Sequence, residues 1–264
     1  MKKNKFFGKY YKCQNKDGYT IAFIDSISNE GKMVQIINND KSYYVTNISD
    51  IEINDHHIKC DIHQKDLSIK GELIFSNYKK VKKDIMSYFR LFPIECKHQI
   101  YSMNHTVNGT LIINDKEINF LDSDGYIEGD KGRNFPNKYL WLNSTKRDCS
   151  LTLAIATIPL IGFSIKGITC LIKTKEKEYL FGTYNFAKII KLERNHLIIK
   201  KNKYELEIFI SDFIAHKLKA PVKGDMVRFI HECPSVEINY TLKYKNKVII
   251  NKNDKYASYE FMFD

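Results

Sequence analysis

The chain has 264 residues, of which 43% are hydrophobic and 13% aromatic, and its 42 lysines and arginines against 31 aspartates and glutamates give a net charge of +11. This composition excludes a disordered chain, and the length allows one large domain or two smaller ones, each with its own core. A basic chain invites nucleic acid as a partner, but only five of its basic residues are arginines and its lysines are scattered, which argues against nucleic-acid binding.

The N-terminus and the cysteines indicate a cytoplasmic protein. The basic residues of MKKNKFFGKYYK are not followed by the apolar core of a secretory signal. None of the six cysteines forms a C-x-x-C motif, so we expect reduced thiols.

The first part of the chain predicts short strands at residues 19–25, 33–37, 43–48 and 72–75, separated by polar turns. The segment HHIKCDIH at residues 56–63 has residue types that bind zinc. As a strand, however, it places His57 and His63 on one face and His56 and Cys60 on the other. Splitting the ligands in this way argues against a metal site.

Residues 81–92 form the clearest helical pattern, with Val81, Ile85 and Phe89 spaced by four and Pro93 at the end. His98 and His105 follow, seven residues apart, and would point to opposite faces of an ideal strand. Either the two histidines are unrelated, or a bulge between them brings both inward.

Beyond residue 105 the pattern is again one of short strands. They are expected at residues 110–113, 117–120, 139–142, 151–158, 164–172, 179–184, 187–192, 196–200, 204–211, 226–231, 236–244, 248–250 and 256–263. Many short, closely spaced strands with no βαβ rhythm predict an all-β, antiparallel barrel or sandwich.

The longest apolar run, residues 151–165, is too short to span a membrane as a helix and is interrupted by Pro159 and Gly162. It predicts a buried hairpin that turns between these two residues. The alternative is an apolar lip that touches a membrane surface transiently or admits a lipid.

The stretch DSDGYIEGDKGRNFPNKYLWLN, residues 122–143, concentrates the chemistry of the chain. Its three glycines predict a backbone that bends or lies against a neighbour, and we expect a bent, charged corner. Tyr126, Glu128 and Asp130 alternate and would share one strand face. We also expect Arg133 to bridge Glu128 or Asp130 through its planar guanidinium. The alternative is a turn at the rim of a sheet whose charges pair in solvent.

The segment GYIEGDKGRNFPNKYLW resembles the signature of the tocopherol cyclase-like family. Three further segments are similar to family members: SYFRLFPIECKHQIYSMNHTVNG, MVRFIHE and the closing ASYEFMFD. The resemblance covers essentially the whole chain. Plant members carry Trp where this chain has Lys131 and an amide where it has Asp130.

The resemblance implies two lipocalin-like β units side by side with an apolar pocket between them, as in related carotenoid hydratases and pericyclase-type cyclases. We place the boundary before the signature, which gives units of residues 1–121 and 122–264.

Family enzymes protonate an alkene of a prenylated quinol, and the phenol closes on the cation without metal or cofactor. That chemistry requires an acid, aromatic walls and a proton acceptor. We therefore predict Glu128, Asp130, His98 and His231 as catalytic, and as ligand-binding Tyr126, Arg133, Phe135, Tyr139, Trp141 and His105. The alternative function is a non-catalytic carrier of a hydrophobic, isoprenoid-like molecule.

Overall fold

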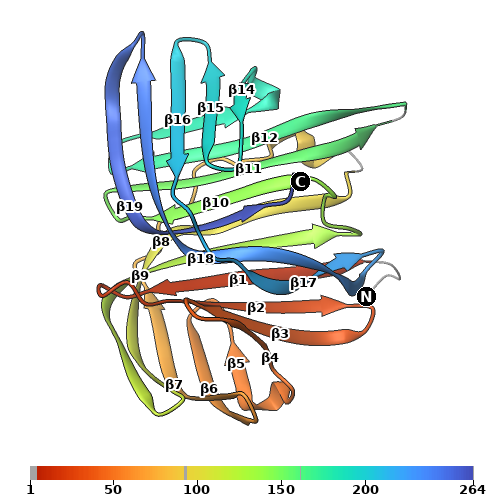
Figure 1. Cartoon of the computed structure of the whole chain (residues 1–264), viewed down its shortest axis with the longest axis vertical. Coiled ribbons are helices and arrows are strands. Elements are labelled where there is room, and N and C mark those ends of the chain that lie inside the picture. The colour runs from red at the N-terminus through yellow and green to blue at the C-terminus, as the bar shows by residue number, and fades with distance from the viewer. Residues whose placement is uncertain (1–4, 92–93, 161, 264) are drawn as a thin grey trace.

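The computed structural model describes residues 5–91, 94–160 and 162–263. They form two antiparallel sheets, one above the other in Figure 1. Within these residues, no helix is both long and apolar enough to cross a membrane.

The first sheet has nine strands in the order β4-β3-β2-β1-β9-β8-β7-β6-β5. Their bounds are β1 (Phe6–Gln14), β2 (Thr20–Ser28), β3 (Gly31–Asn38), β4 (Ser42–Tyr44), β5 (Ile51–Ile53), β6 (His57–Gln64), β7 (Leu67–Ser76), β8 (Cys96–Ile113) and β9 (Lys116–Gly132).

The second sheet has the order β13-β12-β11-β10-β19-β18-β16-β15-β14, and β17 also pairs with β18. Their bounds are β10 (Tyr139–Thr145), β11 (Cys149–Leu160), β12 (Phe163–Thr174), β13 (Glu178–Gly182), β14 (Lys188–Leu192), β15 (His196–Lys201), β16 (Tyr204–Ile210), β17 (His216–Val222), β18 (Asp225–Tyr244) and β19 (Lys247–Phe261).

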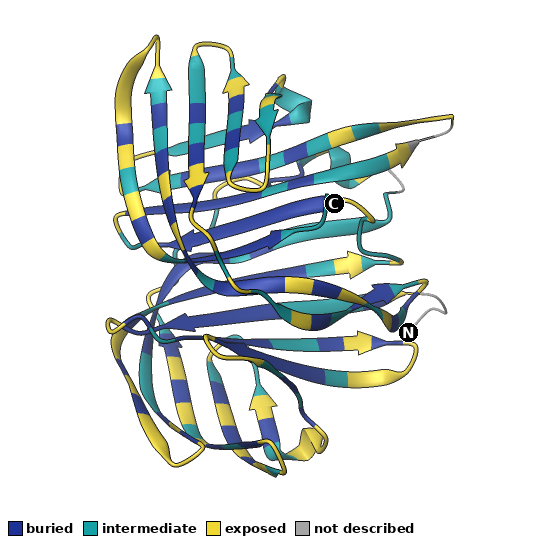
Figure 2. Ribbon diagram, in the orientation of Figure 1, coloured by how far each residue is buried: buried dark blue, intermediate teal, exposed yellow. Residues whose placement is uncertain are grey.

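The predicted all-β class with two units side by side is confirmed. Each sheet has its own apolar core, one around Phe23, Ile36 and Leu111, the other around Leu142, Ile199 and Tyr240. Burial alternates along strands such as β6, whereas every residue of β10 is buried (Figure 2). β10 is buried throughout because it lies where the two sheets meet.

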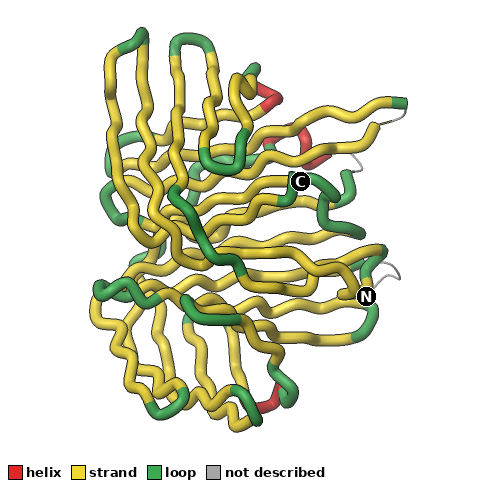
Figure 3. Tube along the Cα trace, viewed as in Figure 1, coloured by secondary structure: helices red, strands yellow, loops and turns green. Residues whose placement is uncertain are grey.

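The helix predicted over residues 81–92 is wrong. The described part of this segment contains only the 3-10 helix η2 (Ser87–Leu91), one of three short helical turns with η1 (Ile48–Asp50) and η3 (Thr183–Asn185) (Figure 3). The Asp84 carboxylate accepts from the backbone N–H of Met86 at 2.9 Å, and Ser87 has a φ of 47°. Turn formation at Asp84 and Ser87 therefore prevails over the helical spacing. Residue 92, the last of the prediction, lies outside the described residues.

The change from the first sheet to the second lies between Gly132 and Tyr139. The boundary predicted at residue 121 falls inside β9, which pairs with β8 from Lys116 to Gly132 and with β1 from Asp124 to Gly132. The signature up to Gly132 thus belongs to the first sheet, and its last strand, β10, belongs to the second.

The signature forms a strand instead of a bent corner up to Gly132. Its glycines do not have positive φ but permit close approach: a Cβ on Gly125 would lie 2.1 Å from His105 Nε2, and one on Gly132 would lie 1.9 Å from the Glu95 carbonyl oxygen. The density of glycine therefore reflects tight packing of β9 against its neighbours.

Two local predictions are confirmed in part. β11 and β12 form the hairpin expected over residues 151–165, with Leu160 paired with Phe163 at its tip, but Pro159 and Phe163 are exposed, so the hairpin is not buried along its whole length. In β6, His57 and His63 face outward while Cys60 is buried in the core of the first sheet, so these residues of HHIKCDIH are divided between faces. His56, which was expected to share the face of Cys60, precedes the strand and is exposed.

Candidate functional site

A cavity of about 190 Å³ lies between the two sheets. A third apolar cluster surrounds it, with Tyr10, Ile100 and Tyr126 from the first sheet and Trp141, Leu171 and Ile230 from the second. The cavity is lined by apolar and aromatic side chains together with polar ones, which include His98, Asp130 and the glutamates Glu128, Glu232 and Glu260. Glu95, Lys9 and Lys219 also belong to the lining. Exposed Pro159 is also part of the lining, so the cavity reaches the surface at the β11–β12 hairpin.

Strand register places these polar groups on two walls. On the first sheet, Glu128 of β9 lies opposite Tyr10 of β1, and Asp130 lies opposite His98 of β8. On the second sheet, Glu260 of β19 lies opposite both Glu232 of β18 and Trp141 of β10. Residues directly opposite on adjacent strands share one face, so each wall carries its polar groups as a cross-strand set.

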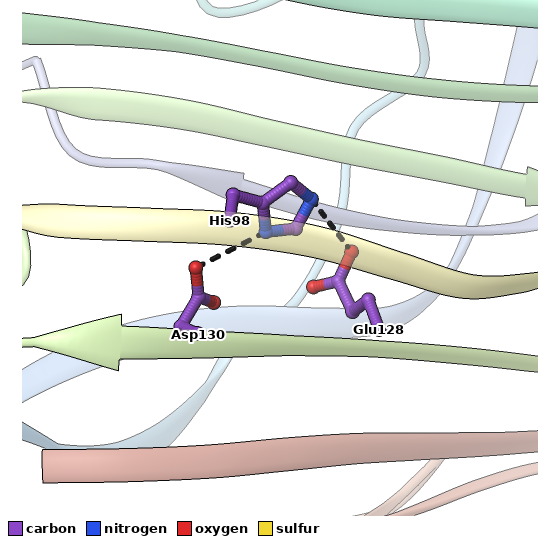
Figure 4. A group of neighbouring side chains, drawn as sticks. All are labelled: His98, Glu128 and Asp130. Carbon is purple, nitrogen blue, oxygen red and sulfur yellow. Dashed lines mark hydrogen bonds and ion pairs between the residues drawn. The ribbon is translucent and has the colours of Figure 1, made fainter. Parts of the chain in front are cut away.

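On the first wall, His98 lies between two carboxylates (Figure 4). Its Nδ1 is 3.1 Å from Asp130 Oδ1, within a hydrogen bond, and its Nε2 is 3.2 Å from Glu128 Oε2, an ion-pair distance without hydrogen-bond alignment. Burial would lower the pKa of His98, but the charges of Glu128 and Asp130 outweigh it and raise the pKa well above its usual value. His98 is therefore an imidazolium ion at neutral pH.

Glu128 is 5% exposed and accepts further donors at the same oxygen. The Tyr126 hydroxyl donates to Oε2 at 2.5 Å, and the indole N–H of Trp141 donates to it at 3.0 Å from across the cavity. Two donors and a cation stabilise a negative charge on this carboxylate.

On the second wall the carboxylates have tyrosine partners instead. The Tyr10 hydroxyl donates to Glu232 Oε1 at 2.5 Å, and the Tyr139 hydroxyl donates to Glu260 Oε2. Burial raises the pKa of Glu232 to about 7 and that of Glu260 well above its usual value. Neither glutamate is in an ion pair among the described residues.

The ligand atoms of His98, Glu128 and Asp130 lie within 4.8 Å of one another, a spacing that could also hold a metal ion. The histidine already places one ring nitrogen on each carboxylate, and a metal ligand must be a neutral imidazole. The arrangement therefore fits a proton-bound charge cluster better than a metal centre.

The structure brings together six of the ten predicted site residues on the cavity: His98, Glu128, Asp130, Phe135, Tyr139 and Trp141. Tyr126 lies behind them and reaches the cluster through its hydroxyl.

The other three predicted site residues lie elsewhere. His105 is buried in the first sheet against Phe75 and Tyr78, so β8 does not bring it beside His98. His231 is exposed on β18, between Ile230 and Glu232, which both face the cavity. Arg133 is exposed beyond the end of β9, and among the described residues it forms no ion pair with Glu128 or Asp130, which His98 contacts instead.

Sequence reasoning missed Tyr10, Glu232 and Glu260. The two glutamates lie in the segments MVRFIHE and ASYEFMFD, where Glu232 alternates with Ile230, and Glu260 alternates with Met262. An acid at an apolar position of such an alternation is a signal for a buried functional carboxyl, because an isolated buried charge is costly.

A scan of protein-family models finds no match, and a search of curated proteins finds none either. Solved structures do match along nearly the whole chain. Kievitone hydratase from Nectria haematococca aligns with a TM-score of 0.56 at 7% identity, over 98% of this chain and 89% of that one.

Two other solved structures are similar. A protein assigned as AttH from Nitrosomonas europaea gives a TM-score of 0.52 at 10% identity, over 98% of this chain and 92% of that one. CghA, solved with Sch210972, gives 0.60 at 8% identity, over 97% and 88% of the two chains. At these identities the similarity establishes a shared two-unit fold. Kievitone hydratase is one of the proteins with this fold.

Proposed function

We propose that the protein is a cofactor-free acid catalyst that cyclises or isomerises a prenylated quinol or a related isoprenoid-like lipid. The observation that carries this proposal is the combination of buried carboxyl groups and aromatic walls around one apolar cavity. The resemblance of the signature to tocopherol cyclase-like proteins, and the fold shared with a hydratase, agree with it.

The cavity meets the physical demands of alkene protonation. Such chemistry needs a carboxylic acid that stays protonated near neutral pH, and burial raises the pKa of Glu232 to about 7. A carbocation needs aromatic faces and little water, which Tyr10, Trp141 and Phe135 supply. The phenol that closes the ring must lose its proton to an acceptor, and the first wall offers Glu128 and Asp130.

The size of the cavity limits what it encloses. Its volume of about 190 Å³ is below the range of about 300–1,000 Å³ that small-molecule sites usually have. We therefore expect it to enclose the reacting end of the substrate, with the rest of the isoprenoid chain leaving beside Pro159.

The test is product analysis with prenylated quinols, comparing the wild type with Glu128→Gln and Asp130→Asn. These isosteric changes keep the shape of the site but remove a carboxylate, and at least one should reduce turnover by about 10²-fold or more while the lipid still binds. Binding is followed by quenching of Trp141, the single tryptophan of the chain. Full turnover in both variants would contradict a role of the first wall in the reaction.

A carrier is the second candidate function. Glu128, Glu232 and Glu260 each accept a hydrogen bond from Tyr or Trp, as expected of a satisfied structural network. A carrier would show no product in the wild type, and its affinity would depend on the aromatic wall, so that Trp141→Ala weakens binding more than either carboxylate change. Because Trp141→Ala removes the only tryptophan of the chain, ligand binding to this variant is measured by calorimetry.

A further inference from the structure

The second wall contains two carboxyl groups on neighbouring strands, and no described cation lies within ion-pair distance of either. Glu232 and Glu260 are direct cross-strand partners, so their side chains leave the sheet on the same face, with Cβ atoms about 4.5–5.5 Å apart. Both line the cavity, and they are 1% and 7% exposed. Ionising two carboxyl groups that are this close together and this well shielded from water requires a large free energy.

Lys12 acts electrostatically on Glu232 and lowers its pKa, but burial outweighs this effect, and no cation forms an ion pair with either glutamate among the described residues. β1 contributes Tyr10, which donates to Glu232, and Lys12, whose Nζ donates to the Tyr256 carbonyl oxygen at 2.9 Å. Arg228, on β18 itself, donates to the carbonyl oxygens of Pro136 and Asn137. The remaining groups near the pair are the neutral Tyr139 and Cys233 and the acidic residues of the first wall, Glu128 and Asp130.

We propose that Glu232 and Glu260 share one proton at neutral pH and act as the proton donor of the site, while Glu128 acts as the acceptor. The two walls differ in their partners: tyrosine hydroxyls donate to the pair, whereas Glu128 has the His98 imidazolium beside it. The raised pKa values of Glu232 and Glu260, due to burial, agree with this division of roles. The assignment of donor and acceptor, which is the catalytic half of the inference, rests on the proposed function. The shared proton does not.

The reaction balances without an oxidant or a reductant. An O–H bond of the pair breaks, and its proton forms a C–H bond at one alkene carbon, leaving a cation at the other. The phenol oxygen forms a C–O bond to this cation, and the phenol proton passes to Glu128. Exchange with solvent returns the proton from Glu128 to the pair, so the product is an isomer of the substrate.

The shared proton can be measured without a substrate. Infrared spectroscopy of the ligand-free protein detects the C=O stretch of a protonated carboxyl, which is absent from a carboxylate. We expect this band in the wild type at pH 7, and we expect it to persist in Glu128→Gln and to disappear in the double variant Glu232→Gln/Glu260→Gln. Glu237→Gln, which changes an exposed glutamate of β18, serves as the matched control. Absence of the band from the wild type, or its persistence in the double variant, would overturn the shared proton.

Turnover tests the catalytic half. Glu232→Gln and Glu260→Gln should each lower turnover of a prenylated quinol by about 10²-fold or more, and Glu237→Gln should not. Substrate turnover that survives both pair variants would refute the donor assignment while leaving the proposed function intact. A band at pH 7 without turnover of any isoprenoid by the wild type would refute the proposed function and the catalytic half while leaving the shared proton intact.

Discussion

Glu128 and Glu232 are both buried, at 5% and 1% exposed, and both accept a tyrosine hydroxyl at 2.5 Å. Of these two, only Glu128 has an ion-pair partner among the described residues, and that partner is His98. Burial raises the pKa of Glu232 to about 7, whereas His98 compensates a negative charge on Glu128. The two carboxyl groups thus differ in charge compensation because they have different partners, and not because one is more buried than the other.

Because of this difference, the two walls of the cavity differ in charge. The first wall holds two carboxylates and an imidazolium in close contact, while the second wall presents carboxyl groups that favour the neutral form. A site with donor and acceptor on opposite walls can give a proton on one side of a bound molecule and take one on the other.

Removal of His98, the cation beside Glu128, should have the largest effect on stability. His98→Leu leaves Glu128 buried without its cation, and we expect the free energy of unfolding to fall by about 3 kcal/mol at pH 6. Because the pKa of His98 is raised in the folded state, its contribution is fully present below the unfolded value of 6.5 and is lost as pH rises through the folded value. The loss in the variant should therefore be smaller at pH 9, as urea unfolding at both pH values would measure.

His57→Leu is the matched control for that experiment. His57 Nε2 also lies beside a carboxylate, 3.1 Å from Glu52, but the Glu52 side chain is 64% exposed. A solvated pair contributes little, so this change should cost less than about 1 kcal/mol. Equal losses in the two variants would show that His98 does not compensate a buried charge.

Glu232 should show the opposite dependence on pH to a paired carboxylate. Its folded pKa of about 7 lies above the unfolded value of 4.5, so the native state binds more protons between them and stability falls as pH rises. From pH 5 to pH 8 we expect the wild type to lose about 2 kcal/mol relative to Glu232→Gln. Unfolding curves for both proteins at the two pH values measure this, and Glu237→Gln should follow the wild type. A constant difference between wild type and Glu232→Gln would place the titration of Glu232 outside this range.

The fold could be predicted because its signals are local. Alternating strands and polar turns gave the all-β class, and the β11–β12 hairpin followed from Pro159 and Gly162. The wrong prediction of a helix at residues 81–92 shows the limit of such local signals. The spacing of four between apolar residues indicated a helix, but it carried no information on the turn formed by Asp84 and Ser87.

The site could be predicted only where its residues are close in sequence. Tyr126, Glu128 and Asp130 share a face of β9, as their spacing indicated, and Trp141 lies in the next strand. The partnership of Glu232 with Glu260 depends on the register of β18 and β19, which shifts between Cys233 and Val236. No local pattern encodes such a shift, so the second wall emerged only from the structure.

His105 is a second buried histidine of β8, and unlike His98 it has no carboxylate acting on its pKa. Burial lowers its pKa to about 3. A depressed value in the folded state means that stability is present above the unfolded value of 6.5 and is lost as pH falls. Between pH 6.5 and 5.5 we expect the wild type to lose about 1 kcal/mol relative to His105→Gln, which cannot titrate in this range. Nuclear magnetic resonance titration of the two histidines should show His98 protonated and His105 neutral at pH 6; the same state for both would contradict the contrast.

Arg133→Lys should have the smallest effect. Arg133 was expected to hold Glu128 or Asp130, but the contacts that the structure gives it are through its backbone: its N–H donates to the Glu95 carbonyl oxygen at 2.8 Å, and its own carbonyl oxygen accepts from Gly224. Lysine keeps both bonds, so the free energy of unfolding should change by less than about 0.5 kcal/mol, and ligand binding should be unchanged.

Arg147→Lys is the contrasting variant, because the Arg147 guanidinium contacts Asp122 at 2.6 Å and Asp124 at 2.9 Å, a multi-donor geometry that lysine cannot reproduce. Thermal unfolding of the two variants side by side decides the matter: a larger loss in Arg133→Lys than in Arg147→Lys would mean that the Arg133 guanidinium, and not His98 alone, supports the first wall.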